Sequence, residues 1–369
     1  MPRGNQELTS ARFDPQREVA SALEQLESLR EPLTSDMPID DLERFEASWK
    51  HALGRALLGP LTGADARRLA AFHRDINLLP KYKSYAIKAS SPLGYSIFFQ
   101  EQGKGFSFQQ HRHHKIEIFH VLDALPGAFA LICTLAEWNA AYDIREFSRW
   151  LEGSSNSLYD RWRIPLSPGD VICLERTGIV HSVIGCTLEE FATASTDMVD
   201  RLHDQNAGAS IPESYHREKV LDLLRTIPSP SSSQKITGPG GKRLPLEWQG
   251  FEGGEIVTLG EVQGLRASRI RLGIKRQTLL KSGDNSIALF ASRGDALLLL
   301  GTAEEFTHLN PPSLELPRGT ATMIPPGMSY EVAALDQEVE ISIHSIRPNV
   351  ALTQGSARTQ LRTEGAPWS

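Results

Sequence analysis

From about residue 85 onward the chain is a succession of short β-type segments, and this texture constrains the fold more than any other feature. The segments are apolar or alternating, and Gly, Pro or Asp separates each from the next. Many short strands at such spacing predict an all-β sandwich or barrel. The strands expected in a first block are Gly94–Gln100, Ile116–Leu122, Ala128–Leu135, Trp162–Leu166, Asp170–Leu174, His181–Ile184 and Leu188–Ala194.

A second block of the same texture follows a segment rich in Pro, Ser and Gly over 227–242, which has the composition of a linker. Its turns and strands come in the same order as those of the first block, so an internal duplication is expected. Helical segments are expected over Trp138–Trp150 (a short helix or a long loop) and Glu213–Arg225. The strands expected in the second block are Glu255–Leu259, Ala267–Leu272, Ser286–Phe290, Asp295–Leu300, Thr320–Ile324 and Glu338–Ile343.

Helical periodicity precedes both blocks. Val19, Leu23, Leu26 and Leu29 recur at three- and four-residue steps, which predicts a first helix. Ile39–Leu58 and Ala64–Ile76 are expected as second and third helices. Their apolar stripes predict a packing surface for a neighbouring domain or a second chain. The expected domains are a helical extension over 1–84, a metal-binding barrel over 85–226, a linker over 227–243, a degenerate barrel over 244–348 and a tail over 349–369.

Composition excludes several classes of protein. The 369 residues are 40% hydrophobic and 23% charged, which is typical of a globular chain with a sizeable core. The net charge of −6 offers no attraction to nucleic acid or anionic lipid, and no apolar stretch is long enough to span a bilayer. Residues 1–10 show no signal peptide, and the three cysteines lack a CxxC pair, so buried thiols and a cytoplasmic location are expected.

Two histidine-containing segments carry the chemistry. The segment "GKGFSFQQHRHHKIEIFHVL" contains His111, His113 and Glu117, and "LSPGDVICLERTGIVHSVIG" supplies His181. Side chains alternate on a strand, so the first three share one face if the strand pairing continues through the turn. A third imidazole from a neighbouring strand would complete a site of three nitrogens and one oxygen. Such a site suits a divalent ion of Fe, Mn, Ni, Co or Zn.

These spacings resemble the two motifs of the cupin superfamily. Gly105 is followed after five residues by His111, then by His113 and Glu117, and a Pro-Gly-Asp turn at 168–170 precedes His181. The resemblance implies a double-stranded β-helix, the cupin jelly roll, with two barrels in tandem and an intact metal quartet in the first. The chain departs from the motifs in two places: the glycine that closes the first is displaced to Gly127, and Arg176 and Thr177 replace the usual turn.

The second block resembles the same fold without the ligands. Lys281, Ser282 and Gly283 occupy the place of the histidines, and Tyr330 stands where the second-motif histidine would be. A metal site is therefore not expected there. This barrel could support dimerisation, shape or ligand selectivity, which makes a homodimer a candidate assembly.

Within the superfamily, "SFQQHRHHKIEIFHVL" and "EEFATASTDMVDRLHDQNAG" are similar to segments of type II phosphomannose isomerase cupins. This resemblance implies a small-molecule substrate with carbohydrate or sugar-phosphate chemistry. Relative to that pattern, one extra residue lies between His113 and Glu117, and the identity of the substrate does not carry over.

Isomerising a sugar needs a Lewis acid and a group that moves a proton. Glu190 on the strand after His181, Lys115 and Arg201 are the candidate catalytic residues. Lys115 or Arg201 could also neutralise a phosphate or carboxylate of the substrate, whereas Glu190 could instead hydrogen-bond a ligand histidine. Gln109 is an alternative oxygen ligand.

The leading hypothesis is a metal-dependent isomerase or epimerase of a sugar or sugar phosphate. A non-haem iron dioxygenase of the cupin type is the first alternative, because histidines and a carboxylate with open positions also activate dioxygen. The second alternative is a non-catalytic bicupin that binds a small molecule. Trp138, Trp150 and Trp162 could wall the pocket, whereas His114 and His120 are expected to face outward or to pack.

Overall fold

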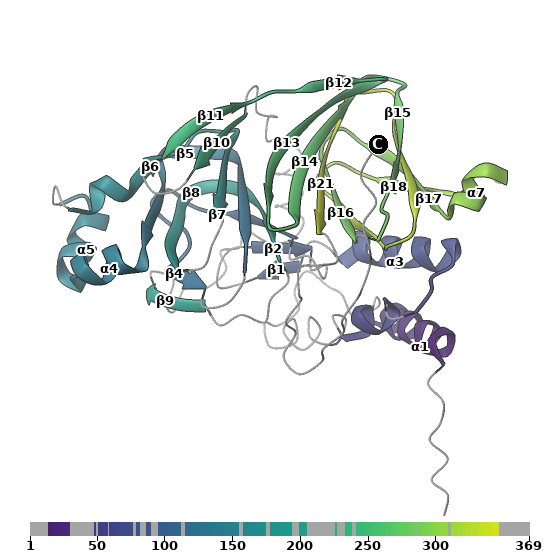
Figure 1. Ribbon diagram of the computed structural model, residues 1–369, viewed down its shortest axis with the longest axis horizontal. Coiled ribbons are helices and arrows are strands. Elements are labelled where there is room, and N and C mark those ends of the chain that lie inside the picture. Colours follow the sequence, from purple (N-terminus) through teal and green to yellow (C-terminus); the bar gives the residue numbers. More distant parts are fainter. Residues whose placement is uncertain are drawn as a thin grey trace, which may run out of the picture.

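The computed structural model describes residues 14–346 except 30–47, 49–50, 58, 77–78, 82–85, 90–94, 112–114, 155–157, 175–177, 194–198, 205–225, 227–232, 238–240, 285 and 309–310. Strands form two successive barrel-like units, and helices lie at the outer ends of the pair and below the second unit (Figure 1). The expected fold class, mainly β with two tandem barrels and an N-terminal helical extension, is confirmed. Among the described residues there is no helix with the length and apolar character needed to cross a membrane.

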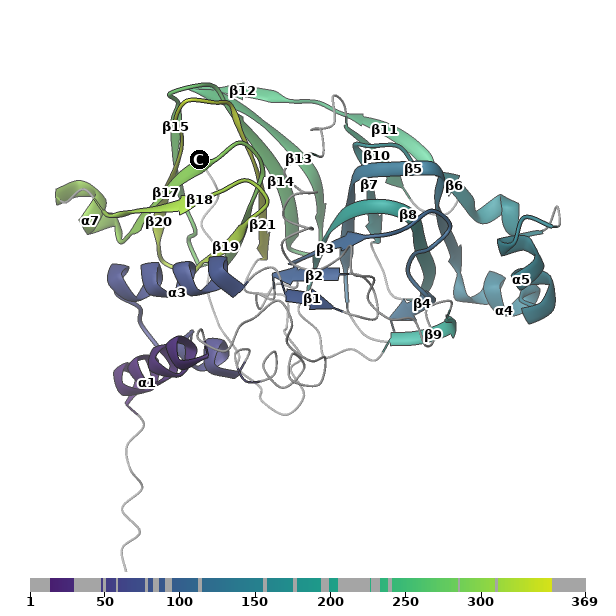
Figure 2. The same cartoon turned by 180° about the vertical axis from the view of Figure 1, so that it is seen from behind.

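Of two N-terminal helices, α3 (Gly63–Ile76) lies against the second barrel, and α1 (Pro15–Ser28) packs against α3 (Figure 2). The Asp14 side chain caps α1 by accepting hydrogen bonds from the backbone of Gln16 and Arg17. These helices confirm the first and third expected ones. Of the second, residues 51–56 are helical and most of the remainder lies outside the described ranges.

The first barrel is built around two long antiparallel strands, β5 (Glu117–Thr134) and β8 (Ile179–Ala192). The sheet order is β1-β2-β3-β8-β5-β7-β10-β11, while β4 pairs with β8 and β9, and β6 pairs with β5. The other strands are β1 (Leu79–Lys81), β2 (Ala86–Ala89), β3 (Tyr95–Phe99), β4 (Phe108–His111), β6 (Arg163–Pro165), β7 (Asp170–Leu174), β9 (Val199–His203), β10 (Ser233–Thr237) and β11 (Lys242–Leu246).

The expectation of four shorter strands in place of β5 and β8 was wrong. Their pairing shifts register between Val121 and Asp123 and again between Ala124 and Phe129, so the strands bend without ending. The segment expected as a linker also differs, because it contains β10, which pairs in parallel with β7 and buries Ile236.

A helical excursion between β5 and β6 comprises α4 (Leu135–Ala141), α5 (Ile144–Leu151) and the 3₁₀ helix η1 (Leu158–Trp162). Thr134 and Glu137 form a capping box at its start. Trp138, Trp150 and Trp162 are buried in one aromatic cluster against residues of β5 and β8 such as Leu131 and Val180. Along β5 and β8 these residues alternate with the ones that face the barrel interior. The three tryptophans therefore pack against the outer face of the barrel and do not wall a pocket.

The second barrel consists of a six-stranded sheet, β12-β13-β14-β21-β16-β19, and a four-stranded sheet, β15-β20-β17-β18. All six strands expected here are present. Sequence reasoning missed β12, β15, β18 and β20; the first three are largely exposed, whereas β20 is buried. The bounds are β12 (Gln249–Phe251), β13 (Gly254–Val262), β14 (Leu265–Leu272), β15 (Gln277–Lys281), β16 (Ile287–Arg293), β17 (Ala296–Gly301), α7 (Ala303–His308), β18 (Ser313–Leu316), β19 (Ala321–Ile324), β20 (Ser329–Ala334) and β21 (Val339–Ile346).

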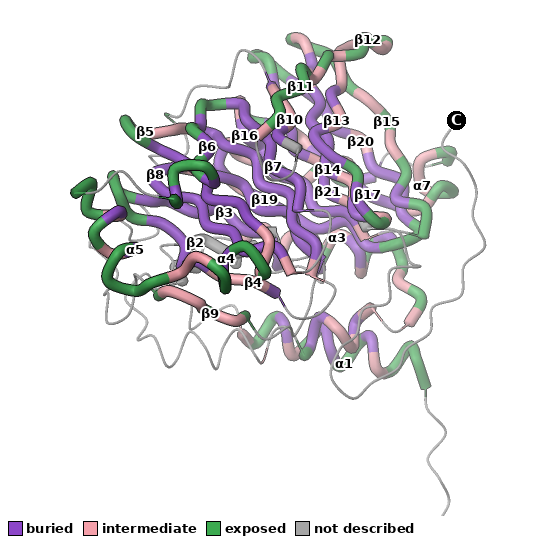
Figure 3. Tube along the Cα trace, turned by 60° about the vertical axis from the view of Figure 1, so that its left-hand side comes forward, coloured by how far each residue is buried: buried purple, intermediate pink, exposed green. Residues whose placement is uncertain are grey.

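The two barrels pack sheet against sheet, and a single apolar cluster crosses their boundary. It joins Phe99 on β3, Ile118 on β5 and Phe191 on β8 with Leu259 on β13 and Phe290 on β16. Buried residues, coloured purple, accordingly follow the strands of both barrels, whereas exposed residues, coloured green, gather at turns and at α7 (Figure 3). The outer face of the β3-β8-β5-β7 part of the first sheet is therefore covered, and only its inner face is available for a site.

Candidate metal centre

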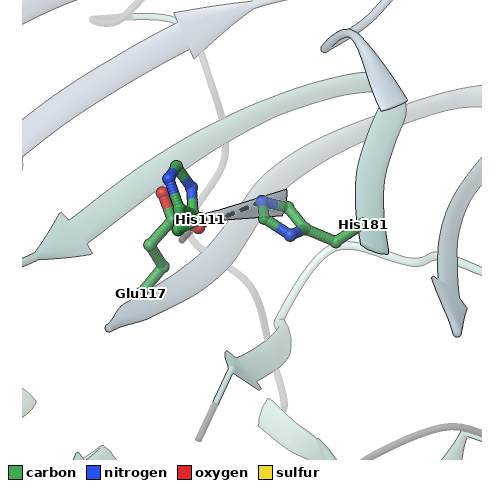
Figure 4. A group of neighbouring side chains, drawn as sticks. All are labelled: His111, Glu117 and His181. Atoms are coloured by element: carbon green, nitrogen blue, oxygen red, sulfur yellow. Dashed lines mark ion pairs between the residues drawn. The ribbon is translucent and has the colours of Figure 1, made fainter. Parts of the chain in front are cut away.

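Three side chains from three different strands meet inside the first barrel (Figure 4). His111 ends β4, Glu117 begins β5 and His181 lies near the start of β8. Glu117 Oε2 is 3.2 Å from His111 Nε2 and 3.1 Å from His181 Nε2. The motif residues that sequence reasoning combined from two segments about sixty positions apart are thus adjacent in space, apart from His113, which lies outside the described residues.

Gly105 allows the segment leading into β4 to lie directly on β8. It forms a bridge with Ile184, and a Cβ atom added to it would lie 2.1 Å from the carbonyl oxygen of Val183. Since real side chains do not approach so closely, glycine is required at this position. Because of this contact, Gln109, four residues after Gly105, pairs with His181. The pairing brings the histidine of one motif beside that of the other.

The three groups have unsatisfied atoms directed at one another. The exposed fractions of His111, Glu117 and His181 are 4%, 1% and 2%. Neither Nε2 atom nor Glu117 Oε2 has a hydrogen bond of acceptable geometry, although they lie within hydrogen-bond distance. Buried polar atoms without partners cost free energy, and convergent lone pairs of two imidazoles and a carboxylate suit a divalent ion. The residues therefore fit a metal ion.

The protonation states favour the same conclusion. His181 Nδ1 donates to the backbone oxygen of Ile179 at 3.2 Å, which orients the ring so that Nε2 faces Glu117 Oε2. Burial alone would raise the pKa of Glu117. The charges of His111, Lys115 and His181 outweigh this effect and hold the pKa well below its usual value, so the side chain is a carboxylate.

Lys115 and Glu190 lie beside the cluster. The Lys115 ammonium contacts Glu117 Oε1 and lies 3.2 Å from Glu190 Oε1. Burial opposes its charge, but the two carboxylates raise the pKa of Lys115 above its ordinary value. The two oxygens of Glu117 are therefore divided, with Oε1 on the lysine and Oε2 facing the histidines.

Arg201 is placed differently. It pairs with Gln109 across β9 and β4, so the two share a face of this strand pair, the face that also carries His111. Its side chain is half-exposed and lies 4.0 Å from Asp204. The structure thus puts Arg201 next to the cluster at the protein surface, whereas Lys115 and Glu190 are largely buried.

Apolar and aromatic side chains fill the barrel interior around the cluster. The Phe119 ring lies 6.1 Å from that of His181, and Phe106 packs between Phe119 and Phe98 at 5.7 and 4.6 Å. A small molecule that reached the three ligands would therefore contact rings on one side and the Lys115–Glu190 pair on another.

No protein-family model and no curated protein matches the chain. Similar solved structures include mannose 6-phosphate isomerase from Bacillus subtilis, at 14% identity and a TM-score of 0.44 over 68% of this chain and 74% of that one. Salicylate 1,2-dioxygenase from Pseudoaminobacter salicylatoxidans is similar at 13% and 0.44 over 86% and 93%, and the 11S globulin from Wrightia tinctoria at 12% and 0.44 over 71% and 79%.

These structures are cupin-fold proteins. An isomerase, a dioxygenase and a globulin occur at the same TM-score, so the likeness separates none of the three functional hypotheses. The choice between them depends on the side chains of this chain.

The corresponding region of the second barrel has no such group among the residues described. Ser282 donates its hydroxyl to the backbone oxygen of Met328, and Tyr330 is buried in the apolar core. Burial raises the pKa of Tyr330, which keeps the phenol neutral.

His120 packs in the interior of the molecule, as expected, but it also hydrogen-bonds Glu189, a residue that sequence reasoning did not single out. The available signal was the pair of adjacent glutamates at 189 and 190, which a strand must direct to opposite faces.

Proposed function

We propose that the chain is a metal-dependent enzyme of the cupin type that isomerises or epimerises a sugar or sugar phosphate. His111, His113, Glu117 and His181 would hold a divalent ion of Fe, Mn, Ni, Co or Zn. The observation that carries the proposal is the convergence of three buried ligand atoms that lack a well-aligned hydrogen bond, next to a lysine–glutamate pair. When bound, such an ion polarises a carbonyl or hydroxyl oxygen of the substrate.

Lys115 and Glu190 are the groups suited to move a proton. Their charged atoms lie 3.2 Å apart, close enough to share one proton between ammonium and carboxylate. Glu190 would accept a proton from a carbon next to the substrate carbonyl, and Lys115 would stabilise the negative charge that develops. Arg201, half-exposed and on the same face as Gln109, would bind a phosphate or carboxylate of the substrate.

The test combines metal analysis with a substrate panel. Protein purified without added metal would be analysed for bound metal and then incubated in D₂O with aldose, ketose and sugar-phosphate substrates. We expect deuterium to enter the substrate at the carbon beside the carbonyl. Glu190→Gln should lower kcat, measured per bound metal ion, about 10²- to 10⁴-fold. Glu101→Gln, at an exposed glutamate, is the matched control and should leave turnover unaltered.

The second candidate is a non-haem iron dioxygenase, and the apolar, phenylalanine-lined interior favours it. Phe98, Phe106 and Phe119 suit an aromatic substrate better than a polyhydroxylated one. Bound iron together with substrate-dependent oxygen uptake would refute the isomerase and support this candidate. Tight binding of one small molecule without turnover or oxygen uptake would instead favour the non-catalytic bicupin.

A further inference from the structure

The sheets that pack against each other bury charged groups as well as apolar ones. Glu189 on β8 and His120 on β5 belong to the first barrel, whereas Ser342 on β21 and Arg269 on β14 belong to the second. Their exposed fractions are between 0% and 2%. Such groups are costly to bury unless they are paired, so the pairing across this boundary is a specific feature of the molecule.

Glu189 accepts hydrogen bonds from both barrels. The Ser342 hydroxyl lies 2.8 Å from Oε1 and 3.1 Å from Oε2, and His120 Nδ1 lies 3.1 Å from Oε2. Burial opposes the ionisation of Glu189. The contacts with His120, Arg269 and Ser342 outweigh that opposition and hold its pKa below the usual value, so it accepts as a carboxylate.

Ser342 is itself held firmly. It lies on β21, which runs between β14 and β16, and it pairs with Arg269 on one side and Phe290 on the other. Arg269 Nε is 3.5 Å from Glu340 Oε2, on the same face of β21 two residues away. Because β21 is paired on both sides, the position of the Ser342 hydroxyl is well defined, and so is the position of the Glu189 carboxylate that it contacts.

Strand β8, which carries Glu189, also carries Glu190 beside the metal centre. Consecutive residues of a strand face opposite sides, so Glu189 faces the second barrel and Glu190 faces the interior of the first. Strand β5 repeats the arrangement, because His120 pairs with Glu189 and Phe119 pairs with Glu190. From Glu190 the contacts continue through Lys115 to Glu117.

We propose that Ser342 is a positioning residue for the metal centre, acting from the second barrel through Glu189. By fixing the backbone of β8 it places Glu190, which holds Lys115 on Glu117 Oε1 and thereby directs Oε2 at the two histidines. The inference rests on the proposed metal site and gives the barrel without ligands a role in it. Ligands need placement within about 0.5 Å, and losing an outer hydrogen-bond partner typically weakens metal binding about 10- to 100-fold.

The test is a titration of the metal-free 369-residue protein with cobalt(II) chloride. It measures the dissociation constant and the visible d–d absorption spectrum, which reports ligand geometry. Ser342→Ala should weaken cobalt binding about tenfold and alter the spectrum. Ser342→Thr keeps the hydroxyl and should restore both. Glu189→Gln keeps the side-chain volume, should act in the same direction as Ser342→Ala, and serves if that variant does not fold.

The matched control is Ser282→Ala. Ser282 is also a fully buried serine of the second barrel, and its hydroxyl bonds Met328 away from the boundary. This variant should lose a comparable amount of stability but bind cobalt like the wild type. Equal changes in both alanine variants, or normal affinity and spectrum in Ser342→Ala, would overturn the positioning role alone. A wild-type protein that binds no cobalt would overturn the metal site itself, and the inference with it.

Discussion

Glu117 has three partners and only two oxygens, and this determines what each neighbouring residue can do. Lys115 takes one oxygen, and the imidazoles of His111 and His181 face the other. In the absence of a cation that oxygen lies beside two Nε2 atoms without a well-aligned hydrogen bond. The free energy of the site is thus lowered by an ion that all three can share.

Removing one imidazole should therefore abolish metal binding without unfolding the protein. We expect His181→Ala, and equally His113→Ala, to contain no stoichiometric metal by elemental analysis. Their unfolding should remain cooperative, because the shared apolar cluster and the second barrel do not involve the ligands. His51→Ala, at an exposed histidine, should retain metal. Unfolded His181→Ala protein at room temperature would contradict this expectation.

His344, which lies outside the metal centre, makes the free energy of unfolding depend on pH. His344 is fully buried against the Phe191 ring, and burial lowers its pKa from 6.5 to about 3. Between these values the unfolded chain binds a proton at this position and the folded chain does not, so stability falls as the pH is lowered. The loss between pH 6.5 and pH 5 should be about 2 kcal/mol.

His344→Leu removes that titration and should flatten the curve by the same amount. Urea unfolding of both proteins at pH 7 and pH 5 measures it, since every other titrating group is common to the two. Relative to the wild type, the variant should gain about 2 kcal/mol in free energy of unfolding as the pH falls from 7 to 5. Parallel curves would show that the pKa of His344 is the same in the folded and the unfolded protein.

Among the elements, α3 has a structural role in closing the second barrel. Its Ala66 and Ala70 belong to the barrel core, and it runs beside β19 of one sheet and β17 of the other. Thr322 donates to the Ala70 carbonyl at 2.7 Å, and Arg67 donates to that of Leu300 at 2.9 Å. The helix thus fills the space where the two sheets do not pair.

Enlarging a side chain at that contact should test the role. Ala66→Leu inserts carbon atoms into a filled core and should lower the free energy of unfolding by about 1–3 kcal/mol. Ala64→Leu, on the exposed side of the same helix, should change it by less than about 0.5 kcal/mol. Chemical denaturation of the two variants measures the difference. Similar values would mean that α3 packs loosely.

Sequence patterns predicted elements well where burial is one-sided and poorly where pairing crosses between distant segments. The apolar periodicity of α1 and the alternation of Val257, Thr258 and Leu259 in β13 were sufficient, and the motif spacing found the ligands. The continuity of β5 and β8 was not predictable, because a turn-rich composition and a bulged strand have the same sequence signature. Glu189 was missed because its partner, Ser342, lies on another barrel.

The whole molecule has one apolar cluster that neither barrel completes alone. Ile97 and Phe99 of the first barrel pack with Val257 and Leu259 of the second. We therefore expect calorimetry of the metal-free protein to give one cooperative transition. A fragment of residues 85–226 should be insoluble, since it would expose this face. Two resolved transitions, or a soluble folded fragment, would contradict a common core.

Strand β10 has a consequence for how the chain can be divided. It lies after the first block along the chain, yet it pairs with β7 of the first barrel and with β11, which leads into the second. If the polypeptide were made as two separate pieces, divided between β9 and β10, each piece would keep half of a β7–β10 ladder. Co-expressed halves would then be expected to reassemble through that shared ladder, as in a split-protein complementation system.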